Sequence, residues 1–499
     1  MVSLILESEK PSLTVRSANR AARDVTTLVA GAVSGALFSA LMVFAVPRIV
    51  KVEDFGYWRI FLLYTGYVGF LHLGFLEGAF LAWAGRPIES FRNELLPVLR
   101  FLIVEHLIIL IPVCVVGAVL LPPHIKFLVV SIAFYGLLLN IATLFTCALQ
   151  AARCFGPVAV STAAPIALFL CLVVGLGILG KPDFRILIVY YSLSWLAVTW
   201  YLWWTVQPFR SASTISAWEV GKKYVLMGWP ITLSSTAIIM AQSADRVVLT
   251  SAASIYDFAQ YSLAASTMMV PLTVIAAIAR VFFPHLAGSK REQHPEIYRQ
   301  VSRLILMAWC LMLPYYFAVE SFVRHFLPAY VDGLPYARVL LLGVLFFGYV
   351  QILHGSIFNL HGKQRYFLAY ALVALALGLV LTGIAAHIFR SLMLVAEMQV
   401  FSIGLLWLFI GYRVRDLTGE TSLDVTRVVV LFVWCTASMG IASLWANNWV
   451  TKSLGYWLMV AAPLVWSSRG EMRLILRLAK DGAQEFRSAL PAFRRPVMD

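Results

Sequence analysis

Charged residues are scarce in this sequence. Asp, Glu, Lys and Arg make up 13% of the 499 residues, whereas hydrophobic residues make up 61%. A soluble protein of this length would leave far too much apolar surface in contact with water. Apolar runs of about 20 residues, the length that crosses the hydrocarbon core of a bilayer, recur along the whole chain. The composition therefore excludes a soluble protein and predicts an all-α, polytopic membrane protein.

Cysteine is also sparse, and the motifs of metal and nucleotide sites are missing. The six cysteines are scattered, mostly inside apolar runs, and no CxxC pair or Cys/His cluster occurs. A disulfide framework or a metal site is therefore not indicated. The stretch 175–181 (GLGILGK) matches most of a P-loop, but Pro182 stands where Ser or Thr would hold magnesium, and no strand precedes it. We expect no metal and no cofactor.

Long loops are lacking too, so no catalytic or binding module lies outside the membrane. The pattern predicts about 14 transmembrane helices, at 26–50, 56–84, 101–121, 127–152, 157–180, 186–207, 225–250, 254–285, 302–320, 337–361, 366–388, 391–411, 428–447 and 453–467. The expected organisation is a cytoplasmic N-tail (1–25), a six-helix bundle (26–207), a cytoplasmic linker (208–224), a second six-helix bundle (225–411), two extra helices (428–467) and a basic cytoplasmic tail (468–499).

The distribution of basic residues predicts the topology. With the N-terminus in the cytoplasm, 27 Lys and Arg fall on the cytoplasmic side, 9 on the opposite side and 3 inside spans. Because cytoplasmic segments of membrane proteins are enriched in Lys and Arg, this split favours two cytoplasmic termini. It also accounts for the net charge of +14 without a nucleic-acid partner.

The C-terminal tail, 468–499, differs from the apolar spans because it is rich in basic residues. Its apolar residues share one helical face, with basic residues off that face; they are Met472, Ile475, Leu476, Ala479, Ala483 and Phe486. This pattern favours a basic amphipathic helix on the anionic cytoplasmic leaflet, with a disordered basic tail as the alternative.

A weak repeat relates the two halves. Arg48-Ile-Val before Asp54-Phe-Gly-Tyr is matched by Arg246-Val-Val before Asp257-Phe-Ala-Gln-Tyr. A second pair, 148–155 and 359–367, has a similar spacing of about six helices, which makes the halves parallel repeats.

Two charges lie in the second predicted helix. Arg59 and Glu77 are 18 residues apart and would share one face of a straight helix at a separation of about 27 Å. Glu77 would either bind a coupling cation or proton, or form a structural ion pair. Gly74 and Gly78 have the GxxxG spacing typical of closely packed membrane helices.

Further charges lie in the seventh and eighth predicted helices. Ser235, Gln242 and Arg246 would lie on one side of the seventh, beside Asp245. The eighth would align Ser262, Ser266, Thr273 and Arg280. Two polar-lined helices in succession indicate a water-filled interior. The alternatives are that the arginines extend to the two interfaces, and that Asp245 pairs with a neighbouring helix.

The tenth predicted helix adds a polar face made of Gln351, His354, Phe358 and His361, with Asn359 adjacent. Glu105 and Glu397 are further carboxylates inside spans, either functional or structural partners.

Two stretches resemble a known family. They are 46–57 (VPRIVKVEDFGY) with the following Leu73-Gly-Phe, and Asp245-Arg246-Val-Val-Leu with Tyr261 and Phe283-Pro284-His-Leu286. Both are similar to bacterial polysaccharide flippases of the multidrug/oligosaccharidyl-lipid/polysaccharide exporter superfamily. The resemblance spans roughly residues 20–410. It implies two six-helix bundles around a V-shaped cavity that alternates between the leaflets. The implied substrate is an undecaprenyl-diphosphate-linked oligosaccharide for surface polysaccharide.

In such a flippase, cationic side chains would meet the diphosphate and acidic sugars: Arg59, Arg246 and Arg280. Polar cavity residues would be Gln242, Ser266, Thr273, Gln351, His354 and Asn359. Because the sequence has no ATP site, an ion gradient would drive transport. The coupling ion would be bound by Glu77, Asp245 and Glu397. One alternative is a cation-coupled multidrug exporter of the same superfamily, whose cavity should be acidic or apolar. A membrane polymerase is a weaker alternative, because it needs a sizeable external loop. We expect no enzymatic activity.

The expected partners follow from this function. They are the lipid-linked oligosaccharide and membrane lipids, with a polysaccharide polymerase and a chain-length regulator as candidates. We expect a monomer in the bacterial inner membrane.

Overall fold

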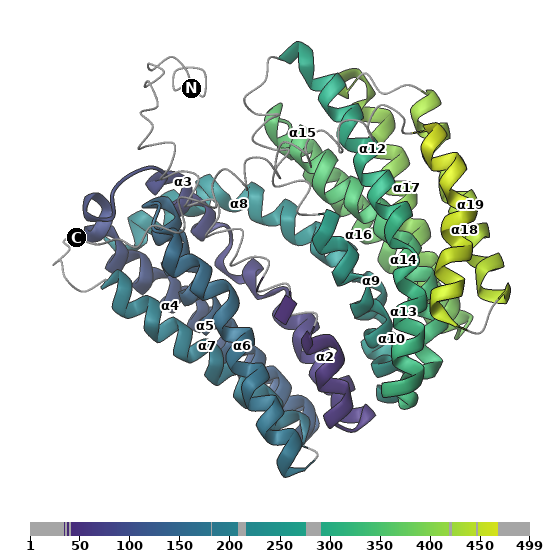
Figure 1. Cartoon of the computed structure of the whole chain (residues 1–499). Helices are drawn as coiled ribbons and strands as arrows, with labels where there is room; N and C mark the ends of the chain where they lie inside the picture. Colours follow the sequence, from purple (N-terminus) through teal and green to yellow (C-terminus); the bar gives the residue numbers. More distant parts are fainter. Residues whose placement is uncertain are drawn as a thin grey trace, which may run out of the picture. The chain divides into compact units, whose positions relative to one another are not determined.

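The computed structural model describes residues 34, 37, 38, 41–180, 182–207, 216–275, 291–418, 422–445 and 448–467. Every regular element in these residues is a helix (Figure 1). Apolar segments become helices because backbone amides in hydrocarbon need partners within their own segment. The chain divides into two compact units, Met1–Thr236 and Ala237–Asp499, with the boundary inside α8.

The first unit contains a broken helix, four long helices and most of a fifth. These are α2 (Val52–Thr65), the 3₁₀-helix η1 (Val68–His72), α3 (Phe75–Trp83), α4 (Ile88–Leu120), α5 (Pro123–Ala151), α6 (Phe155–Leu179), α7 (Phe184–Val206) and α8 (Ala217–Ala241). Helices α5 and α7 pack on each other, with α4 beside α5 and α6 beside α7.

The second unit is built from shorter pieces. They are α9 (Ala244–Ala252), α10 (Ile255–Thr267), η3 (Arg291–Gln293), α12 (His294–Met312), α13 (Tyr315–Phe326), η4 (Pro328–Gly333), α14 (Leu334–Gly348), η5 (Tyr349–His354), α15 (Gly355–Leu360), α16 (Gln364–Gly383), η6 (Ile384–Ile388), α17 (Leu392–Thr418), α18 (Ser422–Trp445) and α19 (Trp449–Ser467). Helix α17 packs on α14 and α16. Helices α18 and α19 form a pair, in which α19 lies beside α12 and α13 and α18 contacts α12.

Eleven helices of the described residues are long and apolar enough to cross a membrane, and the bent segment from α2 to α3 adds a twelfth. The all-helical, multi-pass architecture is therefore confirmed. Of the fourteen predicted spans, 26–50 is described only at residues 34, 37, 38 and 41–50, and 453–467 corresponds to α19, which is not among the eleven. The exact count stays a prediction. The predicted amphipathic tail lies outside the described residues.

The exposed face of helix α4 is apolar, as expected for a surface that contacts lipid. Its exposed side chains form an apolar stripe: Val104, Leu107, Ile108, Ile111, Val115, Val116 and Val119. In water such a stripe would drive aggregation, whereas in hydrocarbon it is the expected outer surface.

The second predicted helix, 56–84, is broken. The segment Val52–His72, which comprises α2 and η1, is bent by 60° relative to α3. The chain turns at Leu73 and Gly74, whose φ angles are 46° and 86°; this left-handed region suits glycine because it has no Cβ. Arg59 and Glu77 therefore do not share one straight helix face, and that prediction is wrong.

Close packing at the predicted GxxxG is confirmed. Gly74 and Gly78 of α3 lie directly against Gly228 and Tyr224 of α8. A Cβ added to Gly228 would overlap the Gly74 carbonyl oxygen, and one added to Gly78 would overlap the Tyr224 carbonyl. The two backbones touch because only glycine leaves room for them.

Candidate functional site

A break between α8 and α9 forms the centre of the candidate site. The span predicted as one helix over 225–250 stops where the Ser243 amide bonds to Met240 O, three residues back, and its hydroxyl donates to Ile239 O at 2.7 Å. Serine hydroxyls that bond back to the preceding turn tend to bend helices. The prediction of one continuous helix face is therefore wrong for Ser235, Gln242 and Arg246.

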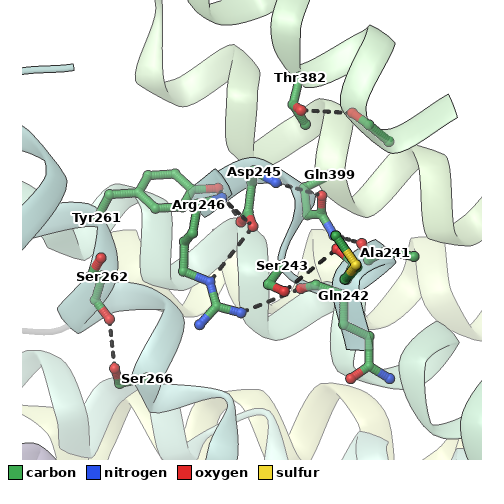
Figure 2. Close-up of polar contacts among 12 residues, drawn as sticks. Ala241, Gln242, Ser243, Asp245, Arg246, Tyr261, Ser262, Ser266, Thr382 and Gln399 are labelled. Atoms are coloured by element: carbon green, nitrogen blue, oxygen red, sulfur yellow. Dashed lines mark hydrogen bonds and ion pairs between the residues drawn. The ribbon is translucent and has the colours of Figure 1, made fainter. Parts of the chain in front are cut away.

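Asp245 is buried just after the break, with 2% of its surface exposed. Its Oδ2 accepts a hydrogen bond from the Tyr261 hydroxyl of α10 at 2.7 Å, and its Oδ1 accepts one from the Arg246 amide at 2.7 Å (Figure 2). Its own amide donates to Gln399 Oε1 of α17 at 3.3 Å, while Gln399 Nε2 donates to Ala241 O at 2.9 Å. Gln399 thus bridges both sides of the break. Such partners are what a buried carboxylate requires.

Arg246 is held in place by this carboxylate. Its Nε lies 3.7 Å from Asp245 Oδ1, and its side chain is 15% exposed. Nη2 donates one long hydrogen bond, 3.5 Å, to Gln242 O, and Nε has no hydrogen-bond partner among the described residues. A guanidinium carries five donors; Nε is buried, so the capacity available to a ligand lies in the two outer nitrogens.

Gln351 joins this group, whereas His354 does not. Gln242 Nε2 donates to Gln351 Oε1 at 2.9 Å. His354 is fully buried and its Nε2 lies 3.0 Å from the Tyr298 hydroxyl of α12. The two predicted neighbours are separated because η5 is a π-helical turn, which widens the helix by one residue per turn and shifts the side-chain pattern. The prediction that they share one face is wrong.

The polar residues predicted for the eighth helix, 254–285, divide into two environments. Ser262 and Ser266 are buried, and Ser266 donates to Ser262 O at 2.6 Å (Figure 2). Thr273 is exposed and donates to Met269 O at 2.7 Å.

One predicted site residue is not brought to this group by the structure, and the side chains of two others are not described. Glu397 is exposed near the start of α17, two residues from the inward-facing Gln399 and so on the other side of the helix. Arg280 lies outside the described residues, as does the side chain of Asn359.

The remaining two predicted residues belong to the first unit. Arg59 is half-buried on α2. Glu77 lies in the first turn of α3, where its Oε2 is 3.5 Å from His72 Nδ1 and makes no hydrogen bond with the described residues.

Sequence reasoning missed the amides that hold the two helix breaks. Gln399 bridges α8 and α9, and Asn140 bonds to the Val68 carbonyl of η1 at 3.0 Å. The available signal was an isolated amide inside an apolar span. The described residues contain no group of three or more His, Cys, Asp and Glu that could hold a metal ion.

Comparison with known proteins gives the family and the fold. The family model described as polysaccharide biosynthesis protein (Polysacc_synt) matches residues 21–290, just over half of the chain. No curated protein sequence matches.

Three solved structures are similar. The lipid II flippase MurJ, in an inward closed conformation, has a TM-score of 0.69 at 11% identity, over 91% of this chain and 99% of that one. An inward-facing multidrug resistance MATE family transporter of the MOP superfamily has a TM-score of 0.60 at 13% identity, over 78% and 96%. A MOP superfamily transporter from Pyrococcus furiosus has a TM-score of 0.52 at 13% identity, over 79% and 95%.

The resemblance seen in the sequence is thus confirmed for family and fold. The chain belongs to the polysaccharide biosynthesis protein family, and its fold is that of the MurJ flippase and the MATE transporters.

Proposed function

We propose that this protein is a flippase that moves an undecaprenyl-diphosphate-linked oligosaccharide from the cytoplasmic to the periplasmic leaflet for surface polysaccharide biosynthesis. The family supports a role in polysaccharide biosynthesis, and the shared fold supports transport. The observation that carries the proposal is Arg246. It is an arginine with spare donors, held by a buried carboxylate at a break in a membrane helix.

The chemistry of Arg246 suits a diphosphate. A guanidinium donates two parallel hydrogen bonds to phosphate oxygens, with a charge that persists at any physiological pH. Asp245 already accepts bonds from Tyr261 and from the α9 backbone. We therefore assign Asp245 to positioning Arg246, not to binding the coupling ion.

The sugars would be met by neutral polar groups. The Gln242–Gln351 pair lies next to Arg246 and offers amide donors and acceptors to sugar hydroxyls. Arg59 and Arg280 are the proposed second and third contacts to anionic groups. Thr273, exposed on the segment after α10, is a further candidate.

The proposed membrane arrangement is fourteen spans with both termini in the cytoplasm of a bacterial inner membrane. The split of basic residues supports the orientation. The proposed organisation is two six-helix bundles, 26–207 and 225–411, with the extra pair at 428–467. A polymerase and a chain-length regulator are proposed partners, and the protein would act as a monomer.

Deletion of the gene tests the proposal. We expect undecaprenyl-linked oligosaccharide to build up on the cytoplasmic face, because synthesis continues while export stops. Extraction and mass spectrometry of the lipid-linked sugars, with enzymatic accessibility in sealed vesicles, would measure it. If no such intermediate accumulates, the protein is not this flippase.

Arg246 tests the site. We expect Arg246→Ala to reproduce the deletion, and Arg246→Lys to restore little, because an ammonium lacks the planar fork. Arg324→Ala is the matched control: Arg324 is 57% exposed and pairs with Glu320 on α13. Full export by both Arg246 variants at normal expression would remove the arginine from the mechanism. Loss of drug efflux with intact export of lipid-linked sugar would instead favour the multidrug exporter.

A further inference from the structure

A pocket of about 450 Å³ lies at one end of the second unit, and Arg246 is not among its lining residues. Two turns of the chain form it: the turn from α9 to α10, residues 249–257, and the turn from η6 to α17, residues 386–392. The volume is within the range of about 300–1,000 Å³ that small-molecule sites occupy. The distribution of basic residues predicts that both turns lie on the periplasmic side.

Polar groups of several kinds line this pocket. They are the hydroxyls of Ser251, Ser254 and Ser391, the Asp257 carboxylate, the His387 imidazole and the Arg390 guanidinium. The other lining residues are alanines and leucines, which offer a ligand no side-chain hydrogen bond. The lining therefore combines a group that binds anions with groups that accept hydrogen bonds from hydroxyls.

Arg390 has a backbone conformation that arginine rarely adopts. It follows the end of η6 with a φ of 51°, and the next amide, that of Ser391, donates to Ala385 O at 3.2 Å. Glycine is the usual residue at such a helix end, because a Cβ costs free energy in the left-handed region. An arginine at this position carries that cost, which makes its side chain a functional candidate.

The side chains of Arg390 and His387 are available to a ligand. Both residues are exposed, and neither side chain makes a hydrogen bond or ion pair with another described residue. Helix α17 begins beside them, and its first turn contains no acidic residue that would balance the positive end of its dipole. Ser391 Oγ accepts from only one of the amides there, that of Leu394, at 3.3 Å. This part of the pocket is therefore suited to an anionic group.

Asp257 gives the other part of the pocket the opposite charge. Its Oδ2 accepts a hydrogen bond from the Ser254 hydroxyl at 2.7 Å, and its amide donates to Ser254 Oγ at 3.1 Å, a reciprocal cap of α10. Within the described part of the chain Oδ1 makes no hydrogen bond, so it can accept one from a ligand hydroxyl. The carboxylate would repel a divalent phosphate. A ligand with one negative charge and several hydroxyls fits both parts of the pocket.

We propose that this pocket is a periplasmic subsite for an acidic sugar, a pyranose that carries one carboxylate, in the exported oligosaccharide. The sugar carboxylate would bind to the planar fork of Arg390 and to His387, and ring hydroxyls would donate to Asp257. The inference rests on the proposed function, and it adds the class of sugar that the flippase would release on the outer side.

The pocket is within reach of the proposed diphosphate site. Ser251 lies five residues beyond Arg246 on α9, which corresponds to a rise of about 7.5 Å. Leu392 lies seven residues before Gln399, the α17 residue that bonds to the Asp245 amide, which corresponds to a rise of about 10 Å. One lipid-linked oligosaccharide can therefore place its diphosphate at Arg246 and a sugar in the pocket.

Binding of free sugars to the full-length protein in lipid nanodiscs tests the pocket. In saturation-transfer NMR we expect methyl glucuronoside to bind, and methyl glucoside, which lacks the carboxylate, to bind about tenfold more weakly. Acetate and free alanine test two simpler ligands, a plain anion and a zwitterion. Competition by either of them at the concentrations at which methyl glucuronoside binds would overturn the assignment to an acidic sugar.

Arg390→Gly separates binding from stability. Because glycine suits a φ of 51°, the relief of backbone strain offsets the greater entropy of the unfolded chain, and we expect thermal stability close to that of the wild type. Affinity for methyl glucuronoside should fall about tenfold. Arg390→Lys keeps the charge without the planar fork and should bind with intermediate affinity. Arg324→Ala, at an exposed arginine outside the pocket, is the matched control and should bind like the wild type. Wild-type affinity in Arg390→Gly would refute the proposal.

Export in cells tests whether the bound sugar belongs to the cargo. We expect Arg390→Gly to leave lipid-linked oligosaccharide on the cytoplasmic face at a level between those of the wild type and the gene deletion, and Arg324→Ala to leave none. Normal export by Arg390→Gly despite weakened binding would overturn the pocket as an export subsite. Because the binding measurement needs no transport, failure of the flippase is distinguishable. Arg390-dependent binding in a protein whose deletion leaves lipid-linked sugars unchanged would refute the flippase, while the sugar site itself would stand.

Discussion

Asp245 shows how one buried carboxylate organises an otherwise apolar region. It contacts α10 through Tyr261 and α17 through Gln399, and it holds the guanidinium of Arg246. Burying an arginine costs free energy unless it has a partner, and the neighbouring aspartate provides one. The same bonds leave the outer donors of the guanidinium unused, which is what a binding residue needs.

Removing the hydroxyl of Tyr261 tests this organisation. Tyr261→Phe takes a hydrogen bond from a buried carboxylate, so we expect the free energy of unfolding to fall by about 1.5–3 kcal/mol. Export of lipid-linked sugar should fall with it, because Arg246 loses its fixed position. Denaturation in mixed micelles and the accumulation assay measure the two effects. Tyr412→Phe, at a residue 72% exposed, should change neither; a stable, fully active Tyr261 variant would contradict this account.

Two helices in the first unit depend on glycine for their contact. At the crossing of α3 and α8 the backbones meet at Gly74, Gly78 and Gly228, within reach of a core that includes Trp83 and Tyr224. The polar end of this contact is Glu94, which accepts hydrogen bonds from Trp83 Nε1 at 2.9 Å and from the Tyr224 hydroxyl. The crossing therefore combines small residues for close approach with a carboxylate that accepts the buried donors.

A methyl group at this crossing should be enough to disturb it. Gly228→Ala places a Cβ on the Gly74 carbonyl oxygen, and the helices have to separate. We expect a loss of about 1–3 kcal/mol in the free energy of unfolding, the usual range for overpacking. Gly175→Ala in α6 is the control, since nothing lies within 4 Å of its added Cβ. That variant should be neutral or stabilised by about 0.5–1 kcal/mol. Equal stability of the two variants would argue against a direct backbone contact.

Breaks recur in the elements that carry the polar groups. Helix α2 breaks at η1, α8 stops before α9, and α14 passes through the π-turn η5. Each break frees backbone groups or shifts the side-chain period, and a nearby polar side chain compensates. This is why helical periodicity predicted the right helices but the wrong faces for Arg59 with Glu77 and for Gln351 with His354.

For the whole molecule, the predicted orientation in the membrane can be tested with cysteines. Cys154 is exposed in the short turn between α5 and α6, which the charge distribution puts in the cytoplasm. We expect a membrane-impermeant maleimide to label it in inside-out vesicles and not in right-side-out vesicles. Asn448→Cys, at an exposed position between α18 and α19 on the predicted outer side, should give the opposite pattern. Mass spectrometry of labelled peptides identifies the site.

The reverse labelling would place both termini outside. The buried Cys310 and Cys435, whose sulfur atoms lie 3.5 Å apart in α12 and α18, should stay unlabelled in either preparation. Labelling of this pair would instead indicate that α18 is not packed on α12.

The sequence by itself determined that this is an all-helical membrane protein, because in hydrocarbon an apolar run of sufficient length has only the helix as a way to satisfy its backbone. It also predicted the close glycine packing. It pointed to Arg246 and Asp245, because a charged residue inside an apolar run is costly and therefore usually has a structural or functional role. Only the tertiary structure decided which polar groups meet. Gln399 and Asn140 reach their partners across 158 and 72 residues. Neither a period of 3.6 residues nor local composition contains information about partners that distant, and the helix breaks they stabilise depend on them.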